Sequence, residues 1–167
     1  MPAPEQPAVP QRPLAGLWWL TVAVFALHNA EEYLRDLPAW ADAHAPAWIA
    51  SVHGDQVGNG IAVAVLTGAA LILAVVAVSA RPAWSSEVLV CFAFVLIVNA
   101  VSHLAMSALS RTLMPGVVTA PLLLLLGVYL VWRLPTVRAT WPTVLVTAAV
   151  AVAAVVGALL LGGWLTA

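Results

Sequence analysis

A histidine and two glutamates follow directly on an apolar stretch near the start of the chain. Residues 14–27 contain no charged side chain, and His28-Asn29-Ala30-Glu31-Glu32 comes next. On a helix, His28 lies three residues before Glu31 and four before Glu32, so these side chains lean over one face. An imidazole with two carboxylates is suited to binding a metal ion or to acid–base chemistry. The alternative is that these carboxylates are ordinary charged groups at the end of a membrane helix.

A second histidine lies in a polar stripe later in the chain. Asn99 and His103 are four residues apart, and Ser102, Ser107 and Ser110 continue the spacing of three and four. In an apolar helix such a stripe must face protein or water. The candidate metal ligands are therefore His28, Glu31, Glu32 and His103, and the candidate catalytic residues are Glu31, Glu32 and Asn99. A plain interhelical hydrogen bond is the alternative for His103.

Composition places these residues in a membrane protein. The chain has 167 residues, of which 63% are hydrophobic and 8% charged, with a mean hydropathy of +1.03. Soluble domains carry about 25% charged residues. A net charge of −1 with six basic residues leaves no basic patch for nucleic acid. The single cysteine, Cys91, excludes a disulfide framework.

The apolar runs predict an all-α, polytopic bundle in the lipid bilayer, with about five transmembrane helices. We expect a disordered tail over residues 1–13 and one transmembrane domain over residues 14–167. The expected spans are residues 14–34, 57–80, 87–109, 117–132 and 143–165. Between the first two spans, Trp40 and Trp48 flank Pro46, which predicts a pair of interfacial turns anchored by indoles. Small residues at Gly60, Ala64 and Gly68 predict close helix contacts, within the chain or in a homo-oligomer.

Arginine positions orient the predicted spans in the cell membrane. Those on the N-terminal side would be Arg12, Arg81, Arg133 and Arg138, against Arg35 and Arg111 on the other side. The positive-inside rule then predicts a cytoplasmic N-terminus and a C-terminus outside. His28 and His103 precede Arg35 and Arg111 by seven and eight residues. Both imidazoles would thus lie about 10–12 Å inside the outer ends of their helices, facing a one-sided pocket.

Three short patterns together resemble the small bacterial family named for its HXXEE motif. They are His28-x-x-Glu31-Glu32, Asn99-x-x-x-His103 and Pro115-Gly116-x-x-Thr119. The third pattern departs from the family's by Leu113, where the family has a tyrosine. The resemblance runs from about residue 28 to 119 and implies a multi-span membrane protein without naming a reaction. From the residues alone, Pro115-Gly116 is interpreted as a turn and Thr119 as a helix-start hydroxyl bonded to backbone.

Several chemistries fit the candidate site. Imidazoles and carboxylates without thiolates favour zinc, iron or manganese, and the few ligands favour one divalent metal over a di-iron centre. Without a metal, Glu31 or Glu32 could act as a general base, while His103 and Asn99 bind an oxyanion. The leading hypothesis is an enzyme acting on a lipid-soluble or interfacial substrate. Rival hypotheses are a cation or proton transporter and a structural membrane partner; whether His44 or His53 joins the site stays open.

Overall fold

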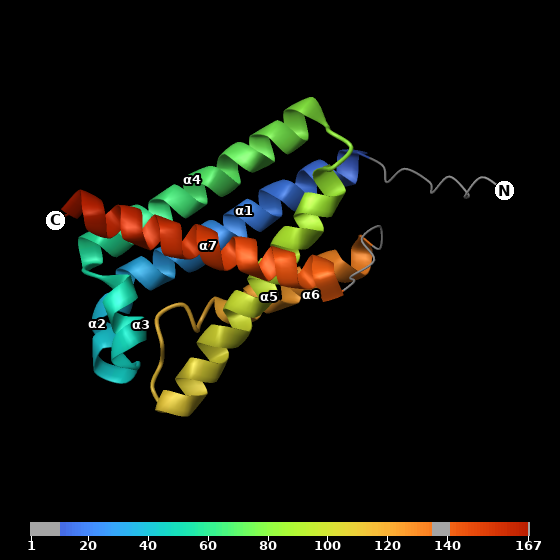
Figure 1. Cartoon of the computed structure of the whole chain (residues 1–167). Helices are drawn as coiled ribbons and strands as arrows, with labels where there is room; N and C mark the ends of the chain where they lie inside the picture. Colours follow the sequence, from blue (N-terminus) through green and yellow to red (C-terminus); the bar gives the residue numbers. More distant parts are fainter. Residues whose placement is uncertain (1–10, 135–140, 167) are drawn as a thin grey trace.

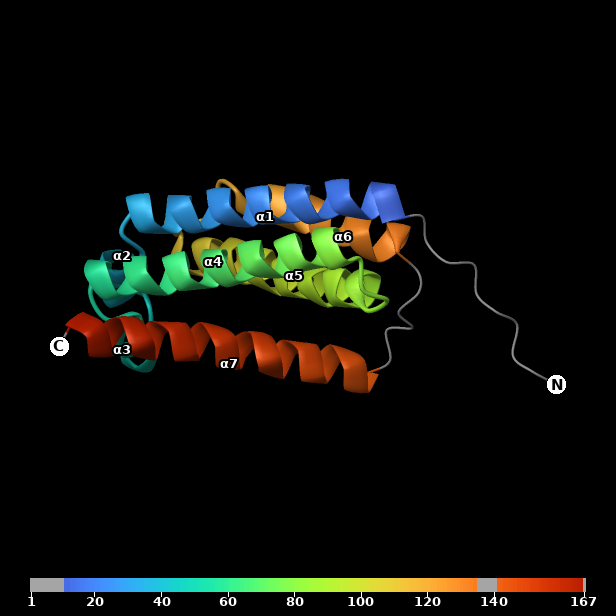
Figure 2. The same cartoon turned by 90° about the horizontal axis from the view of Figure 1, so that it is seen from above.

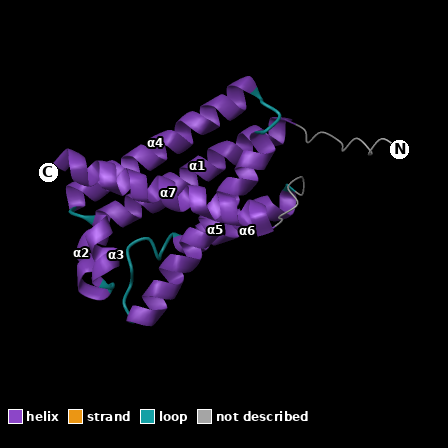
Figure 3. Cartoon of the chain, viewed as in Figure 1, coloured by secondary structure: helices purple, strands orange, loops and turns teal. Residues whose placement is uncertain are grey.

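The computed structural model describes residues 11–134 and 141–166, and every regular element in them is an α-helix (Figure 3). The helices are α1 (Gln11–Leu34), α2 (Leu37–His44), α3 (Ala47–His53), α4 (Gln56–Ala80), α5 (Ser85–Ser110), α6 (Ala120–Arg133) and α7 (Trp141–Thr166). The all-α prediction is confirmed. Of the predicted tail, residues 11–13 belong to α1 and residues 1–10 lie outside the described part.

The helices pack in layers (Figures 1 and 2). Seen from above, α1 and α6 lie along one side, α4 and α5 lie in the middle, and α7 covers the opposite side (Figure 2). The most extensive contacts join α5 to α6, α4 to α7 and α1 to α4. The short helices α2 and α3 lie at the end of the bundle where α1 ends and α4 begins (Figure 1). This arrangement brings the C-terminal part of α1 and the loop that precedes α6 into one region.

Three helices in the described residues are long and apolar enough to cross a membrane. They are α4, α5 and the part of α7 from Leu145 to Thr166. The 14-residue α6 is apolar but shorter than the roughly 20 residues that a span needs. α1 is not among the three, and its last turns carry His28 and both glutamates. The count of five spans and the orientation of the termini therefore stay predictions.

The helix α6 begins three residues later than predicted, at Ala120 instead of position 117. Residues 115–119 form turns, and Gly116 has a φ of +93°, which helices do not contain. Apolar residues at 117 and 118 made the run look helical from the sequence. The turn instead places this backbone beside the candidate site.

The predicted interfacial turns form the two short helices α2 and α3. They separate at Ala45, whose backbone is extended, and Pro46 then occupies the N-cap position of α3, where its carbonyl oxygen accepts from the backbone N–H of Ile49. Trp40 stacks on His44, with ring centroids 5.2 Å apart, and its indole N–H donates to the Thr112 hydroxyl at 3.0 Å. α2 is thereby tied to the loop after α5.

The predicted small-residue contact is confirmed at Gly60 but not at Gly68. A Cβ on Gly60 would lie 2.7 Å from the Tyr33 ring of α1, whereas a side chain at Gly68 would meet no described atom within 4 Å. The closest approach lies instead between α4 and α7, where a Cβ on Gly162 would overlap the carbonyl oxygen of Gly58. This contact holds the end of α7 against the start of α4. A homo-oligomer through small-residue faces stays a prediction.

Gly162→Ala should therefore destabilise the bundle, because the new methyl group forces α7 away from rigid backbone. We expect a loss of about 1–3 kcal/mol in the free energy of unfolding. The matched control is Gly163→Ala, since a Cβ there meets no described atom within 4 Å. Thermal unfolding of both variants in one detergent measures the effect, and equal melting temperatures would contradict the contact.

Candidate metal centre

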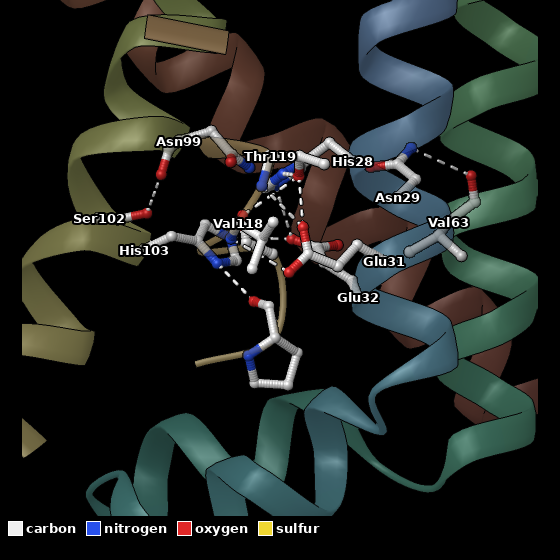
Figure 4. A network of polar contacts seen from close by, with 12 residues as sticks. His28, Asn29, Glu31, Glu32, Val63, Asn99, Ser102, His103, Val118 and Thr119 are labelled. Carbon is white, nitrogen blue, oxygen red and sulfur yellow. Dashed lines mark hydrogen bonds and ion pairs between the residues drawn. The ribbon is translucent and has the colours of Figure 1, made fainter. Parts of the chain in front are cut away.

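Three buried side chains converge between α1 and α5 (Figure 4). The carboxylate oxygen Oε1 of Glu32 lies 3.1 Å from Nε2 of His28 and 2.9 Å from Nε2 of His103. His28, Glu32 and His103 are 0%, 7% and 3% exposed, respectively. One atom from each lies within 4.8 Å of the others. α1 supplies two of these groups from successive turns, and α5 supplies the third.

The remaining nitrogen of His103 determines which tautomer the ring adopts. Its Nδ1 lies 2.7 Å from the backbone carbonyl oxygen of Pro115. A carbonyl oxygen only accepts hydrogen bonds, so Nδ1 carries the proton and donates it. In the neutral ring, Nε2 then has a free lone pair, and this lone pair is directed toward Glu32.

The same reasoning applies to His28, whose Nδ1 lies 2.8 Å from the Thr119 hydroxyl oxygen. That hydroxyl is also 2.7 Å from a carboxylate oxygen of Glu31 and 3.2 Å from the carbonyl oxygen of Gly116. Both of these oxygens are acceptors, so they compete for the single hydroxyl proton. The hydroxyl therefore accepts from His28, and a neutral His28 ring carries its proton on Nδ1 and its lone pair on Nε2.

When both rings are neutral, two lone pairs and one carboxylate face one another in a buried site. Nε2 of His28 is inaccessible, and Glu32, at 3.1 Å, is its nearest polar neighbour in the cluster. Such a group of atoms is electrostatically unfavourable unless a metal ion lies among them or a ring takes up a proton and donates it to Glu32. Ligands bound tetrahedrally at about 2.1 Å are about 3.4 Å apart, which exceeds the two distances from Glu32 Oε1 to the Nε2 atoms, 3.1 and 2.9 Å, by a few tenths of an ångström. The residues therefore fit a metal ion after a small adjustment.

Gly116 closes one side of this cluster. A Cβ at this position would lie 2.7 Å from Cε1 of His103 and 2.8 Å from Cε1 of His28. The backbone of the turn therefore packs directly against both imidazoles. Glu32 and His103 also line a cavity, so any further ligand would approach the cluster from there.

The two neighbouring glutamates have different partners, because successive residues of a helix point about 100° apart. Glu31 accepts hydrogen bonds from the backbone N–H groups of Val118, at 3.1 Å, and Thr119, at 2.8 Å. These groups precede the start of α6, where a negative charge is favourable. An ion pair with Arg35 at 3.6 Å is half-exposed and weak. The structure thus places Glu31 outside the His–Glu–His cluster, where it positions the turn.

The other candidate residues lie around the cavity or away from it. Asn99 lines the cavity with Glu32 and His103, and its Oδ1 is buried without a hydrogen-bond partner among the described residues. His44 and His53 bond to carbonyl oxygens of their own helices, at 3.0 and 2.9 Å. His53 lines the cavity, whereas His44 is exposed and does not. Neither histidine belongs to the cluster.

The contacts of residues 115–119 with the two imidazoles were not predicted from the sequence. The turn supplies the Pro115 carbonyl group and the Thr119 hydroxyl, each of which orients one imidazole. Partners of this kind commonly fix the rings that bind metals. The Pro115-Gly116-x-x-Thr119 pattern was the available signal, but a turn and a backbone-bonded threonine explained it equally well.

Removing the Thr119 hydroxyl should weaken metal binding without removing a ligand. Thr119→Val keeps the shape but leaves Nδ1 of His28 without an acceptor, so we expect about a 10–100-fold loss of metal affinity. Thr119→Ser should retain affinity because it keeps the hydroxyl. Competition with a chromogenic chelator measures both variants. A valine variant that binds as tightly as the wild type would show that the hydroxyl does not support the ring.

A family comparison agrees with the residues of this site. The family described as "Protein of unknown function with HXXEE motif" matches residues 19–132, which include the histidines, the glutamates and the turn. The chain belongs to this HXXEE family. Comparisons with curated proteins and with solved structures found no match.

Proposed function

We propose that this HXXEE protein is a metal-dependent membrane enzyme in which His28, Glu32 and His103 hold one divalent metal ion. The observation that carries this proposal is the pair of hydrogen bonds at the Nδ1 atoms of His28 and His103. The Thr119 hydroxyl and the Pro115 carbonyl each favour a proton on Nδ1. In the neutral rings both Nε2 lone pairs therefore point toward one carboxylate, as the ligands of a metal do.

The ligand set favours a catalytic role over a structural one. Two imidazoles and one carboxylate hold the catalytic zinc of several hydrolases and the iron of many oxygenases, whereas structural zinc sites use four protein ligands. Zinc, iron and manganese are all compatible with these donors. When bound, such a metal supplies Lewis acidity at an open coordination position. Glu32 and His103 border the cavity, so that position would face it.

Residues around the metal centre would hold its ligands and a substrate in position. Thr119 and Pro115 hold the two rings, and Glu31 fixes the turn by accepting two backbone N–H bonds. Asn99 lies on the cavity wall, where its side chain can contact a substrate. The three apolar helices support a site within the membrane. The proposed orientation places this site near the outer face, with a cytoplasmic N-terminus, as the arginine distribution favours.

A cation transporter using the same ligands is the less favoured candidate. A transport path needs polar groups that lead from the site to both faces of the membrane. The cavity beside the cluster continues instead along apolar side chains such as Leu66, Leu73 and Phe92. A lipid-soluble substrate would be stable in such surroundings, whereas a hydrated cation would not.

Metal analysis of the purified protein tests the proposal. After stripping with a chelator and reloading with zinc, ferrous iron or manganese, we expect about one ion per chain of at least one of these metals. His28→Ala should lose this ion, whereas His44→Ala should keep it because His44 bonds to its own helix. No metal in the wild type, or equal metal in the wild type and His28→Ala, would overturn the proposal.

A further inference from the structure

A long cavity passes the metal centre and continues between the helices. Its volume is about 740 Å³, within the range of about 300–1,000 Å³ that small-molecule sites occupy. Along α4 it is lined from Asn59 to Leu73, and along α5 from His103 back to Val88. At 1.5 Å of rise per residue, each of these segments covers about 20 Å. The cavity is therefore long enough for an extended hydrocarbon chain.

The cavity is polar where it passes the metal centre and apolar beyond it. The polar region, here called the head end, contains the side chains Asn29, Glu32, Asn59, Asn99, Ser102 and His103, and residues of α2 and α3 such as Leu37, Trp40, Ile49 and His53 also line the cavity. Apolar residues of α1, α4 and α5 line the stretch along the helices, among them Phe25, Leu66, Ala70, Leu73, Val88 and Phe92, with further apolar side chains from α7. An occupant that matches both regions has one polar head and one apolar tail.

Two buried polar atoms at the head end have no hydrogen-bond partner among the described residues. They are Nδ2 of Asn59, a donor, and Oδ1 of Asn99, an acceptor. Asn59 is only 1% exposed, so water does not satisfy it from the surface. Asn29, by contrast, already donates to the Thr67 hydroxyl at 2.7 Å. Buried polar groups are rarely left unpaired, so these two atoms indicate a ligand that offers one acceptor and one donor.

The charges around the head end favour an uncharged head group. Among the described residues that line the cavity, none is lysine or arginine. Phosphate and carboxylate heads are usually bound by basic side chains, above all arginine. Outside the metal centre the polar side chains include the amides of Asn29, Asn59 and Asn99, the Ser102 hydroxyl, and the imidazole of His53, whose Nδ1 bonds to the Ile49 carbonyl oxygen.

We propose that the cavity binds a single-chain fatty-acyl amide, with its amide group at Asn59 and Asn99 and its chain along the apolar wall. The carbonyl oxygen accepts from Nδ2 of Asn59, and the amide N–H donates to Oδ1 of Asn99. The chain extends between α4 and α5 toward Leu73 and Val88. This inference rests on the proposed function, because it makes the amide the substrate whose carbonyl group lies beside the metal centre.

Photocrosslinking in detergent tests the ligand class. The probe is N-methyl tetradecanamide with a diazirine at the end of its chain, and the labelled residues are mapped by mass spectrometry. We expect labelling around Leu73 and Val88 that unlabelled N-methyl tetradecanamide displaces. Methyl tetradecanoate lacks the N–H, leaves Asn99 unpaired and should compete at least about tenfold less well. Equal competition by the ester, or labelling spread over the outer surface of the helices, would overturn the inference.

Two variant pairs sharpen the test. Ala70→Phe fills the cavity and should abolish the displaceable labelling, whereas Leu71→Phe adds the same ring at a residue that is 44% exposed and does not line the cavity. Asn99→Leu should weaken the amide at least about tenfold and leave the ester nearly unchanged. An Ala70→Phe variant labelled like the wild type would contradict the placement of the chain.

The metal content of the same samples reports on the proposed function separately. His28→Ala should lose the metal and keep most of the displaceable labelling, because His28 does not line the cavity. Labelling of a wild-type protein that binds no metal would overturn the proposed function alone. A metal-loaded protein without displaceable labelling would overturn this inference alone.

Discussion

Glu32→Gln should nearly abolish metal binding, whereas the same replacement at Glu31 should leave most of it. Glu32 Oε1 lies within 3.1 Å of both Nε2 atoms, and glutamine in its place removes the only carboxylate of the cluster. Loss of a direct ligand should exceed the roughly 10–100-fold cost of losing a supporting hydrogen bond. Competition with a chelator, using zinc on both variants, measures the difference.

The neighbouring glutamate is a closely matched control. Glutamine at position 31 keeps a carbonyl oxygen that can still accept from the backbone of Val118 or Thr119, so we expect at most about a tenfold loss of affinity. The two variants have the same size, the same charge change and adjacent positions. Similar metal affinities for both would mean that the cluster is not the metal site.

Gly116→Ala should disrupt the centre and destabilise the fold together. A non-glycine residue at a φ of +93° costs about 1–3 kcal/mol. The new Cβ would also lie 2.7–2.8 Å from atoms of both imidazoles, and forcing such atoms apart adds about 1–3 kcal/mol. The methyl group pushes the rings away from the metal position, so both the melting temperature and the bound metal should fall.

Gly54→Ala separates backbone strain from the clash. Gly54 also has a positive φ, of +61°, but a Cβ there meets no described atom within 4 Å. We expect this variant to lose about 1–3 kcal/mol of stability from backbone strain alone and to keep its metal. Thermal unfolding and metal analysis of both variants give the comparison. A Gly116→Ala protein that behaves like Gly54→Ala would show that the rings do not pack on this glycine.

Local spacing made part of the site predictable. His28 and Glu32 are four residues apart on a helix, so their proximity follows from helical geometry alone. The polar stripe marked His103 as a residue that must face protein, and its place near the end of an apolar run suggested the same depth as His28. The all-α fold followed from the apolar runs, and the break between α2 and α3 from Pro46.

The rest of the site depends on contacts between segments that are far apart in the sequence. Thr119 lies 91 residues after His28, and no local pattern shows that its hydroxyl faces that ring. The difference between Glu31 and Glu32 also arises from the turn that packs beside α1. The burial of Trp18 was also not predictable from local sequence, because tryptophan near the end of a membrane helix usually favours the membrane interface. In the structure Trp18 is 1% exposed, and its indole N–H donates to the hydroxyl of the buried Ser85.

X-ray absorption spectroscopy of the zinc-loaded protein shows which atoms bind the metal. We expect a first shell of nitrogen and oxygen at about 2.0–2.2 Å with outer-shell scattering from two imidazoles. This imidazole signal should fall by half in His103→Ala protein that still holds zinc. A shell with sulfur at about 2.3 Å, or one with oxygen alone, would contradict a centre built from His28, Glu32 and His103.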